Sequence, residues 1–189
     1  MGKLLLKDAL KASYKTKEEA EQTYNNHGYN FDKDLSNIHS RVYYHPDEKN
    51  LLISLRGTKN LLNDVPTDLA ILTGNLKNTD RYKHSKEVLD KAKHKYNTSA
   101  TIIGDSLGGS LASALNSDER DKILTFNKGA GLLHQPHEAK HNENSYRVNG
   151  DIVSSLSSYD HNQKTLGNTI YNPLKAHNLD NLESHSIYV

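Results

Sequence analysis

Cysteine is absent from the 189 residues of this chain, which excludes a disulfide framework, a thiolate metal site and a cysteine nucleophile. Long apolar runs are also missing from its beginning. The three consecutive leucines at residues 4–6 are too few for a signal peptide or a membrane span. We therefore expect a soluble protein that is cytoplasmic or virus-associated, the viral setting being favoured by an Asn- and Lys-rich composition typical of AT-rich coding.

Neither sign of charge is in excess. Lys and Arg total 24 against 23 Asp and Glu, and the net charge of +1 predicts no general attraction to nucleic acid. The hydrophobic fraction is only 34% and the mean hydropathy −0.80. This length and composition indicate one domain with a thin core.

The most informative stretch is residues 99–112, in which an apolar run is followed by a serine between glycines and then by small residues at helical spacing. This order predicts a strand, a tight turn and a helix. Gly104, Ser106 and Gly108 fit the pattern G-x-S-x-G, in which the serine hydroxyl is exposed at a sharp strand-to-helix turn. The alternative is a glycine-rich turn without catalysis.

Other elements follow from periodicity and turn residues. Strands alternating with helices imply a mainly parallel sheet, and hence the α/β class. We expect polar helices over residues 3–38, a hairpin of strands 41–45 and 51–56, a helix at 82–96, strands at 99–103, 122–127, 146–149 and 169–171, and a closing helix at 178–183.

Two further segments extend the pattern of the serine turn: LISLRGT at residues 52–58 and DVPTDL at residues 64–69. With GDSLGGSLA at residues 104–112 they resemble the class 3 lipases. That family usually has His before the nucleophile and Trp in the second segment, where this chain has Asp105 and Val65. The resemblance implies a single-domain α/β hydrolase with a reduced, mainly parallel sheet, an N-terminal antiparallel hairpin and flanking helices. Residues 1–40 would be a helical segment packed on a core formed by residues 41–189.

A serine nucleophile needs a base, and the base needs a carboxylate that orients it. α/β hydrolases order these residues as serine, acid and histidine along the chain. By resemblance to the D-x-V segment of the family we assign the acid to Asp151 rather than Asp160. The base is assigned to His177, which is followed by a short predicted helix, with His185 as the alternative; His161 precedes the last predicted strand.

Oxyanion stabilisation requires two N–H groups aimed at one point. Leu107, directly after the nucleophile, supplies one, and resemblance to the R-G-T turn of the family implies Thr58 for the other. The next segment supplies the lid in that family, so Leu61, Leu62 and Val65 are predicted to bind the acyl chain. The alternative is an ordinary helix that covers the core.

The sequence therefore predicts a serine hydrolase that cleaves carboxylic esters of lipids, with no cofactor, no metal and transient contact with a lipid interface. Its substrate is a lipid or a small ester, and the oligomeric state stays open. Two other classes remain. One is a non-catalytic structural or interaction protein on a hydrolase scaffold. The other is a zinc peptidase, because His137, Glu138 and His141 match H-E-x-x-H.

Overall fold

The computed structural model describes residues 2–58, 76–129, 140–151 and 163–189. Its helical elements are α1 (Leu6–Ala12), α2 (Lys17–Asn25), η1 (Leu76–Asn78), α4 (Asp80–Tyr96), α5 (Leu107–Ala114), α7 (Pro173–His177) and η2 (Leu179–Leu182). Its strands are β1 (Asn30–Asp32), β2 (Ser40–His45), β3 (Asn50–Leu55), β4 (Ala100–Asp105), β5 (Lys122–Phe126), β6 (Glu143–Arg147) and β7 (Lys164–Thr165).

The described strands form one seven-stranded sheet in the order β1-β2-β3-β4-β5-β6-β7. The pairs β1–β2 and β2–β3 are antiparallel, and all later neighbours are parallel. Leu55 is opposite Gly104 and Asp105 is opposite Phe126, so β3, β4 and β5 end at one edge. The predicted α/β class, the hairpin and the mainly parallel sheet are confirmed.

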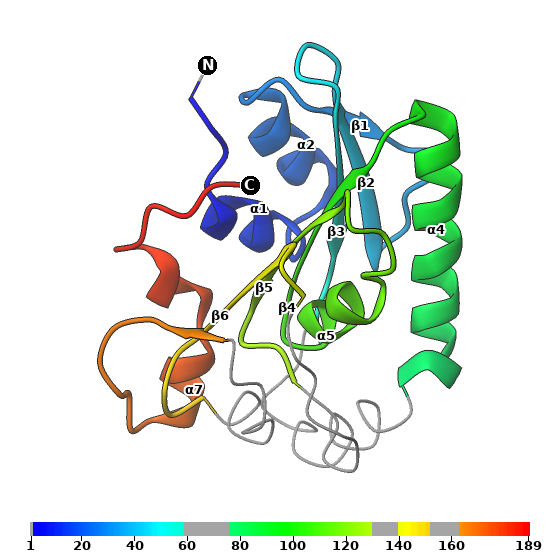
Figure 1. Cartoon of the computed structure of the whole chain (residues 1–189). Coiled ribbons are helices and arrows are strands. Elements are labelled where there is room, and N and C mark those ends of the chain that lie inside the picture. The colour runs from blue at the N-terminus through cyan, green and yellow to red at the C-terminus, as the bar shows by residue number, and fades with distance from the viewer. Residues whose placement is uncertain (1, 59–75, 130–139, 152–162) are drawn as a thin grey trace.

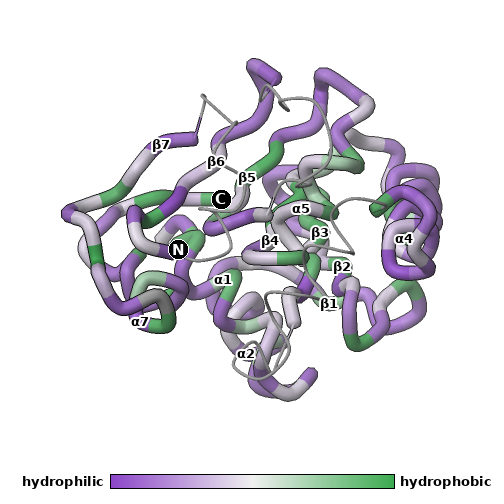
Figure 2. The backbone as a smooth tube through the Cα atoms, turned by 90° about the horizontal axis from the view of Figure 1, so that it is seen from below, coloured by the Kyte–Doolittle hydropathy of each residue, from purple (hydrophilic) through white to green (hydrophobic). Residues whose placement is uncertain are grey.

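Alternating side chains send one apolar set to each face of the sheet. Ile53 and Ile102 pack under α4 and α5, whereas their neighbours Leu52 and Ile103 pack under α1 and α2. Figure 1 shows these two helix layers on opposite sides of the strands. In Figure 2 the tube of α4 is largely hydrophilic, because only one side of it is buried, and α5 is mostly white and green. A sheet covered on both faces accounts for apolar runs in its central strands.

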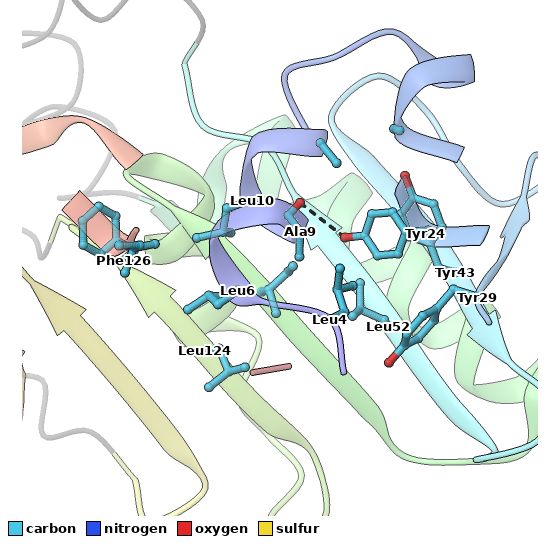
Figure 3. Close-up of a cluster of buried hydrophobic side chains, with 14 of the residues drawn as sticks. Leu4, Leu6, Ala9, Leu10, Tyr24, Tyr29, Tyr43, Leu52, Leu124 and Phe126 are labelled. Carbon is cyan, nitrogen blue, oxygen red and sulfur yellow. Dashed lines mark hydrogen bonds between the residues drawn. The ribbon is translucent and has the colours of Figure 1, made fainter. Parts of the chain in front are cut away.

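Tyrosines complete the layer formed by α1 and α2, as Figure 3 shows. Tyr24 of α2 stacks on Tyr43 of β2 with ring centroids 3.6 Å apart, and Tyr29 meets Tyr24 edge-on at 5.8 Å. The Tyr24 hydroxyl donates to the carbonyl of Ala9 at 3.3 Å, which gives this buried polar group a partner. The Tyr24–Tyr43 stack therefore packs α2 against the antiparallel part of the sheet, and the hydrogen bond to Ala9 joins α1 to α2.

Several predicted bounds were wrong. β6 begins at Glu143 instead of residue 146, and residues 169–171 form no strand. The last described strand is β7, whose two residues are both exposed. Other elements were not expected, among them strand β1 within the N-terminal range and helix α7, which Asn172 caps and Pro173 begins.

The segment before α1 lies beside the C-terminal segment, and an antiparallel bridge joins Leu5 to Tyr188. The Leu6 N–H donates to Ile187 O at 2.8 Å, and the Val189 N–H donates to Leu4 O at 3.0 Å. The division at residue 40 stays a prediction, although β1 extends the sheet across it. Among the described helices none is both long and apolar enough to cross a bilayer.

Candidate active site

Ser106 lies between β4 and α5 with φ 54° and ψ −124°, a backbone conformation that non-glycine residues rarely adopt. Two glycines make this turn possible. A Cβ on Gly104 would lie 2.2 Å from the Gly108 carbonyl oxygen, and a Cβ on Gly108 would lie 2.1 Å from that of Leu55. Any larger residue would therefore separate the helix from the sheet, which explains G-x-S-x-G at this place.

The surroundings of Ser106 leave its hydroxyl unengaged. Its N–H donates to Phe126 O at 3.0 Å, and its Oγ is buried without a hydrogen-bond partner among the described residues. Ser106 is also the N-cap of α5, but its side chain makes no capping bond. The first N–H groups of a helix, that of Leu107 among them, have no intrahelical acceptor and carry the positive end of the helix dipole.

The turn after β3 lies against the serine. A Cβ on Gly57 would be 3.3 Å from Ser106 Cβ and 2.9 Å from Asp105 O. Thr58, the next residue, is exposed. The structure therefore brings the R-G-T turn next to the serine, as the predicted oxyanion site requires.

Asp151, in the loop after β6, and His177, the last residue of α7, are brought together by the fold. His177 Nδ1 is hydrogen-bonded to Asp151 Oδ1; this carboxylate is fully buried, and the imidazole is 12% exposed. A buried carboxylate on Nδ1 fixes the ring orientation and directs Nε2 away from itself. His185 lies elsewhere, beside a cavity of about 400 Å³ that Val148 and Ile170 also line.

Asn127 connects the segments of Asp151 and His177 to the serine turn, a role that no pattern in the sequence predicted. It is fully buried, follows β5 and has φ 47°. Its Nδ2 donates to Ala176 O at 3.1 Å, and its Oδ1 accepts from the Val148 N–H at 2.9 Å. The residue before it, Phe126, accepts the Ser106 N–H, so one short segment holds the serine turn and the approaches to both His177 and Asp151.

Asp105, in the place of the usual histidine of the resembled family, is also buried. Its Oδ2 accepts from the Tyr14 hydroxyl at 2.8 Å, and its Oδ1 has no hydrogen-bond partner among the described residues. Burial raises the pKa of Asp105 to about 6, although the Tyr14 hydrogen bond and the charge of His177 both act to lower it. Tyr14 is 91 residues away along the chain, which is why no local pattern revealed it.

Some predicted positions lie outside the described residues, namely Leu61, Leu62, Val65, His137, Glu138, Asp160 and His161. His141 is described and is exposed in a turn before β6. In the part of the chain that the structure describes, no group of three His, Asp or Glu side chains could hold a metal ion.

Comparison with known families identifies the chain. A family model described as phospholipase-like, a Tle-like phospholipase domain, matches residues 7–180. The chain belongs to this family. The resemblance to lipases is thus confirmed, and the family supports a hydrolase of lipid esters.

The fold of this phospholipase-like domain is found in a solved lipase as well. The crystal structure of the Lip2 lipase from Yarrowia lipolytica matches with a TM-score of 0.54 over 82% of this chain and 71% of that one, at 16% sequence identity. The match confirms the α/β-hydrolase architecture. No curated protein is significantly similar to the chain in sequence.

Proposed function

We propose that this domain is a serine hydrolase that cleaves carboxylic esters of phospholipids. The observation that carries the proposal is the His177–Asp151 hydrogen bond, which Asn127 and Phe126 connect to the strained serine turn. The family supports the substrate class, since its description is that of a phospholipase. Ser106, His177 and Asp151 each have a distinct role in this proposal.

Ser106 Oγ attacks the ester carbonyl while His177 Nε2 removes its proton, and Asp151 stabilises the resulting imidazolium. The tetrahedral intermediate then collapses: the bond to the leaving alcohol breaks, and His177 protonates that alcohol. Water, deprotonated by the same histidine, releases the fatty acid from the acyl-enzyme. No cofactor takes part in this scheme.

The oxyanion is assigned to the backbone amides of Thr58 and Leu107. Leu107 N–H belongs to the first turn of α5, and the R-G-T turn is packed against Ser106. Loss of one such donor typically lowers kcat by about 100- to 1,000-fold. Acyl binding by Leu61, Leu62 and Val65 rests on the sequence alone.

Fluorophosphonate labelling tests the serine mechanism. We expect the probe to modify Ser106, as mass spectrometry of the labelled peptide would show, and Ser106→Ala to abolish labelling and phospholipid hydrolysis. His177→Ala should slow both by several orders of magnitude, because triad members act as a unit. His185→Ala is the matched control and should retain the rate of the unmodified protein.

Each alternative has its own outcome. Hydrolysis retained by Ser106→Ala would refute the serine mechanism. An inactive His185→Ala variant together with an active His177→Ala variant would assign the base to His185. A folded protein that neither labels nor hydrolyses any ester would be the non-catalytic scaffold, and inhibition by EDTA that zinc reverses would favour the peptidase.

Rates on p-nitrophenyl esters of increasing acyl length, with and without Leu61→Ser and Leu62→Ser, would test the acyl-binding role.

A further inference from the structure

A cavity of about 660 Å³ reaches the R-G-T turn at Arg56. The end of α1, the start of α2 and the connection from β1 to β2 form it. Tyr14 and Arg56 are among its lining residues. Both also belong to the surroundings of the serine: Tyr14 binds Asp105, and Arg56 begins the R-G-T turn. The cavity and Ser106 are thus at the same edge of the sheet, because β2 begins opposite the end of β3.

The lining is strongly cationic. The charged side chains are Lys15, Lys17, Lys33, Arg41 and Arg56, against the single carboxylate of Glu19. Glu19 already accepts a hydrogen bond from the Thr16 N–H at 3.2 Å in the capping box of α2. Within the described residues none of the five cations forms an ion pair, whereas lysines elsewhere, such as Lys91 with Glu87, do.

Two of these cations are sheltered from water. Arg41 is only 6% exposed, and its Nη1 and Nη2 donate to the carbonyl oxygens of Ala12 at 2.9 Å and Lys15 at 2.8 Å. Arg56 has a buried Nε without a hydrogen-bond partner, and its guanidinium lies 5.9 Å from the ring centroid of Tyr14. Cations withdrawn from water are normally paired with an anion, and among the described residues neither guanidinium has a carboxylate partner, which favours an anionic ligand in this cavity.

Two residues that line the same cavity are strongly apolar. Phe31 lines it beneath the Lys17 ammonium, which is 5.3 Å from the ring centroid, and Ile38 lines it with 59% of its surface exposed. A phosphate ester has both properties that this lining would recognise: an anionic group for the arginines and lysines, and carbon atoms for Phe31 and Ile38. Arg is especially suited to phosphate because its N–H groups match two oxygens at once.

We propose that this cavity is a phosphate-ester subsite, which holds the phosphodiester of the phospholipid head group while Ser106 attacks the acyl ester. The subsite rests on the proposed function for its lipid substrate, but its affinity for phosphate esters does not depend on catalysis. The cavity therefore selects phospholipids over neutral lipids of the same acyl chains.

Binding is measured on full-length Ser106→Ala protein, which is inactive under the proposed mechanism. Isothermal titration with glycerol 3-phosphate and with inorganic phosphate compares this protein with one that also carries Lys15→Gln and Lys33→Gln. Both lysines are exposed, so their replacement leaves the core untouched. The matched control carries Lys83→Gln and Lys122→Gln, which change the net charge equally outside the cavity.

We expect the cavity variant to bind glycerol 3-phosphate about tenfold more weakly and the control to bind it unchanged. Higher salt should weaken binding by the unmodified cavity, because charge attraction is screened. In proteins that retain Ser106, the ratio of kcat/KM for a short-chain phosphatidylcholine to that for the matching diacylglycerol should fall in the cavity variant alone.

Equal binding by the cavity variant and the control would overturn the subsite, whatever fluorophosphonate labelling shows. Weakened phosphate binding with an unchanged substrate ratio would overturn the head-group role, since the cavity would then bind free phosphate. Failure of the proposed function is distinct: Ser106 would not label, although the cavity still bound glycerol 3-phosphate.

Discussion

Asp105 presents a physical difficulty at the scale of a single residue, because a carboxyl with 5% exposure directly precedes the proposed nucleophile. Tyr14 donates one hydrogen bond to it, and no described cation pairs with it. A buried carboxylate of this kind disfavours ionisation, so its pKa rises from 3.8 to about 6. Because the pKa of Asp105 is higher in the folded state than in the unfolded state, the free energy of unfolding depends on pH.

Between pH 3.8 and 6 the folded state retains a proton that the unfolded state has released. The free energy of unfolding consequently falls as pH rises through this window, and the deficit is complete above pH 6. At about 1.4 kcal/mol per pKa unit the deficit approaches about 3 kcal/mol. Asp105→Asn cannot ionise, yet its Oδ1 can still accept from Tyr14.

We expect Asp105→Asn to be more stable than the unmodified protein at pH 7.5, by up to about 3 kcal/mol, and nearly equal to it at pH 4. Urea unfolding at the two pH values measures the difference. Asp47→Asn, in the exposed turn between β2 and β3, is the control and should show no such pH dependence. The same gain at both pH values would mean that ionisation of Asp105 is not the cause.

At the scale of elements, the first turn of α5 meets the end of β3 at Gly108, a residue without a side chain. The absence of a Cβ lets the helix approach the end of β3, next to the R-G-T turn. Close approach also keeps the helix N-terminus pointed at the site where an oxyanion would form. The spacing between helix and sheet is thus part of the proposed site.

Gly108→Ala has two opposing effects on the free energy of unfolding. Alanine favours the helix by about 1 kcal/mol, but its Cβ would lie 2.1 Å from a backbone oxygen that cannot rotate away. Overpacking of this kind costs about 1–3 kcal/mol or more, so we expect net destabilisation in urea together with a lower kcat. Gly2→Ala, where a Cβ meets nothing within 4 Å, should leave both unchanged. An equally stable and active Gly108→Ala would disprove the close packing.

The elements that sequence predicted and those that it missed differ in what stabilises them. β4 and the hairpin are apolar or alternate, so their periodicity revealed them. β6 begins with Glu143, which looks like a loop residue but is buried, where Lys128 Nζ donates to its Oε1 at 2.7 Å and Ser145 Oγ donates to the same oxygen at 2.9 Å. A strand stabilised by a buried ion pair has no apolar signature.

In the candidate site, too, residues specified by their sequence neighbours could be predicted, whereas residues specified by contacts with distant segments could not. The serine turn is encoded within five residues, because sterics at Gly104 and Gly108 dictate it. The proposed acid and base, Asp151 and His177, were predicted from their order along the chain and by resemblance, and a hydrogen bond joins them in the structure. Tyr14 and Asn127 could not be predicted, since their contacts join segments 91 and 49 residues apart.

At the scale of the whole molecule, the two apolar layers share one sheet. Leu10 of α1 is fully buried in one layer and Leu111 of α5 in the other. The stack of Tyr24 on Tyr43 crosses the proposed boundary at residue 40. A segment that packs so closely should not unfold by itself, because its apolar face has no other partner.

We therefore expect Leu10→Ala and Leu111→Ala each to destabilise the entire chain by about 2–5 kcal/mol, as buried Leu→Ala changes do. Near-UV circular dichroism reports the packed tyrosines and far-UV circular dichroism the helices, and in both variants the two urea transitions should coincide. Ile38→Ala, at an exposed position, is the control and should leave both midpoints in place. If Leu10→Ala shifts the tyrosine transition alone, residues 1–40 unfold as a separate unit and the single-domain prediction fails.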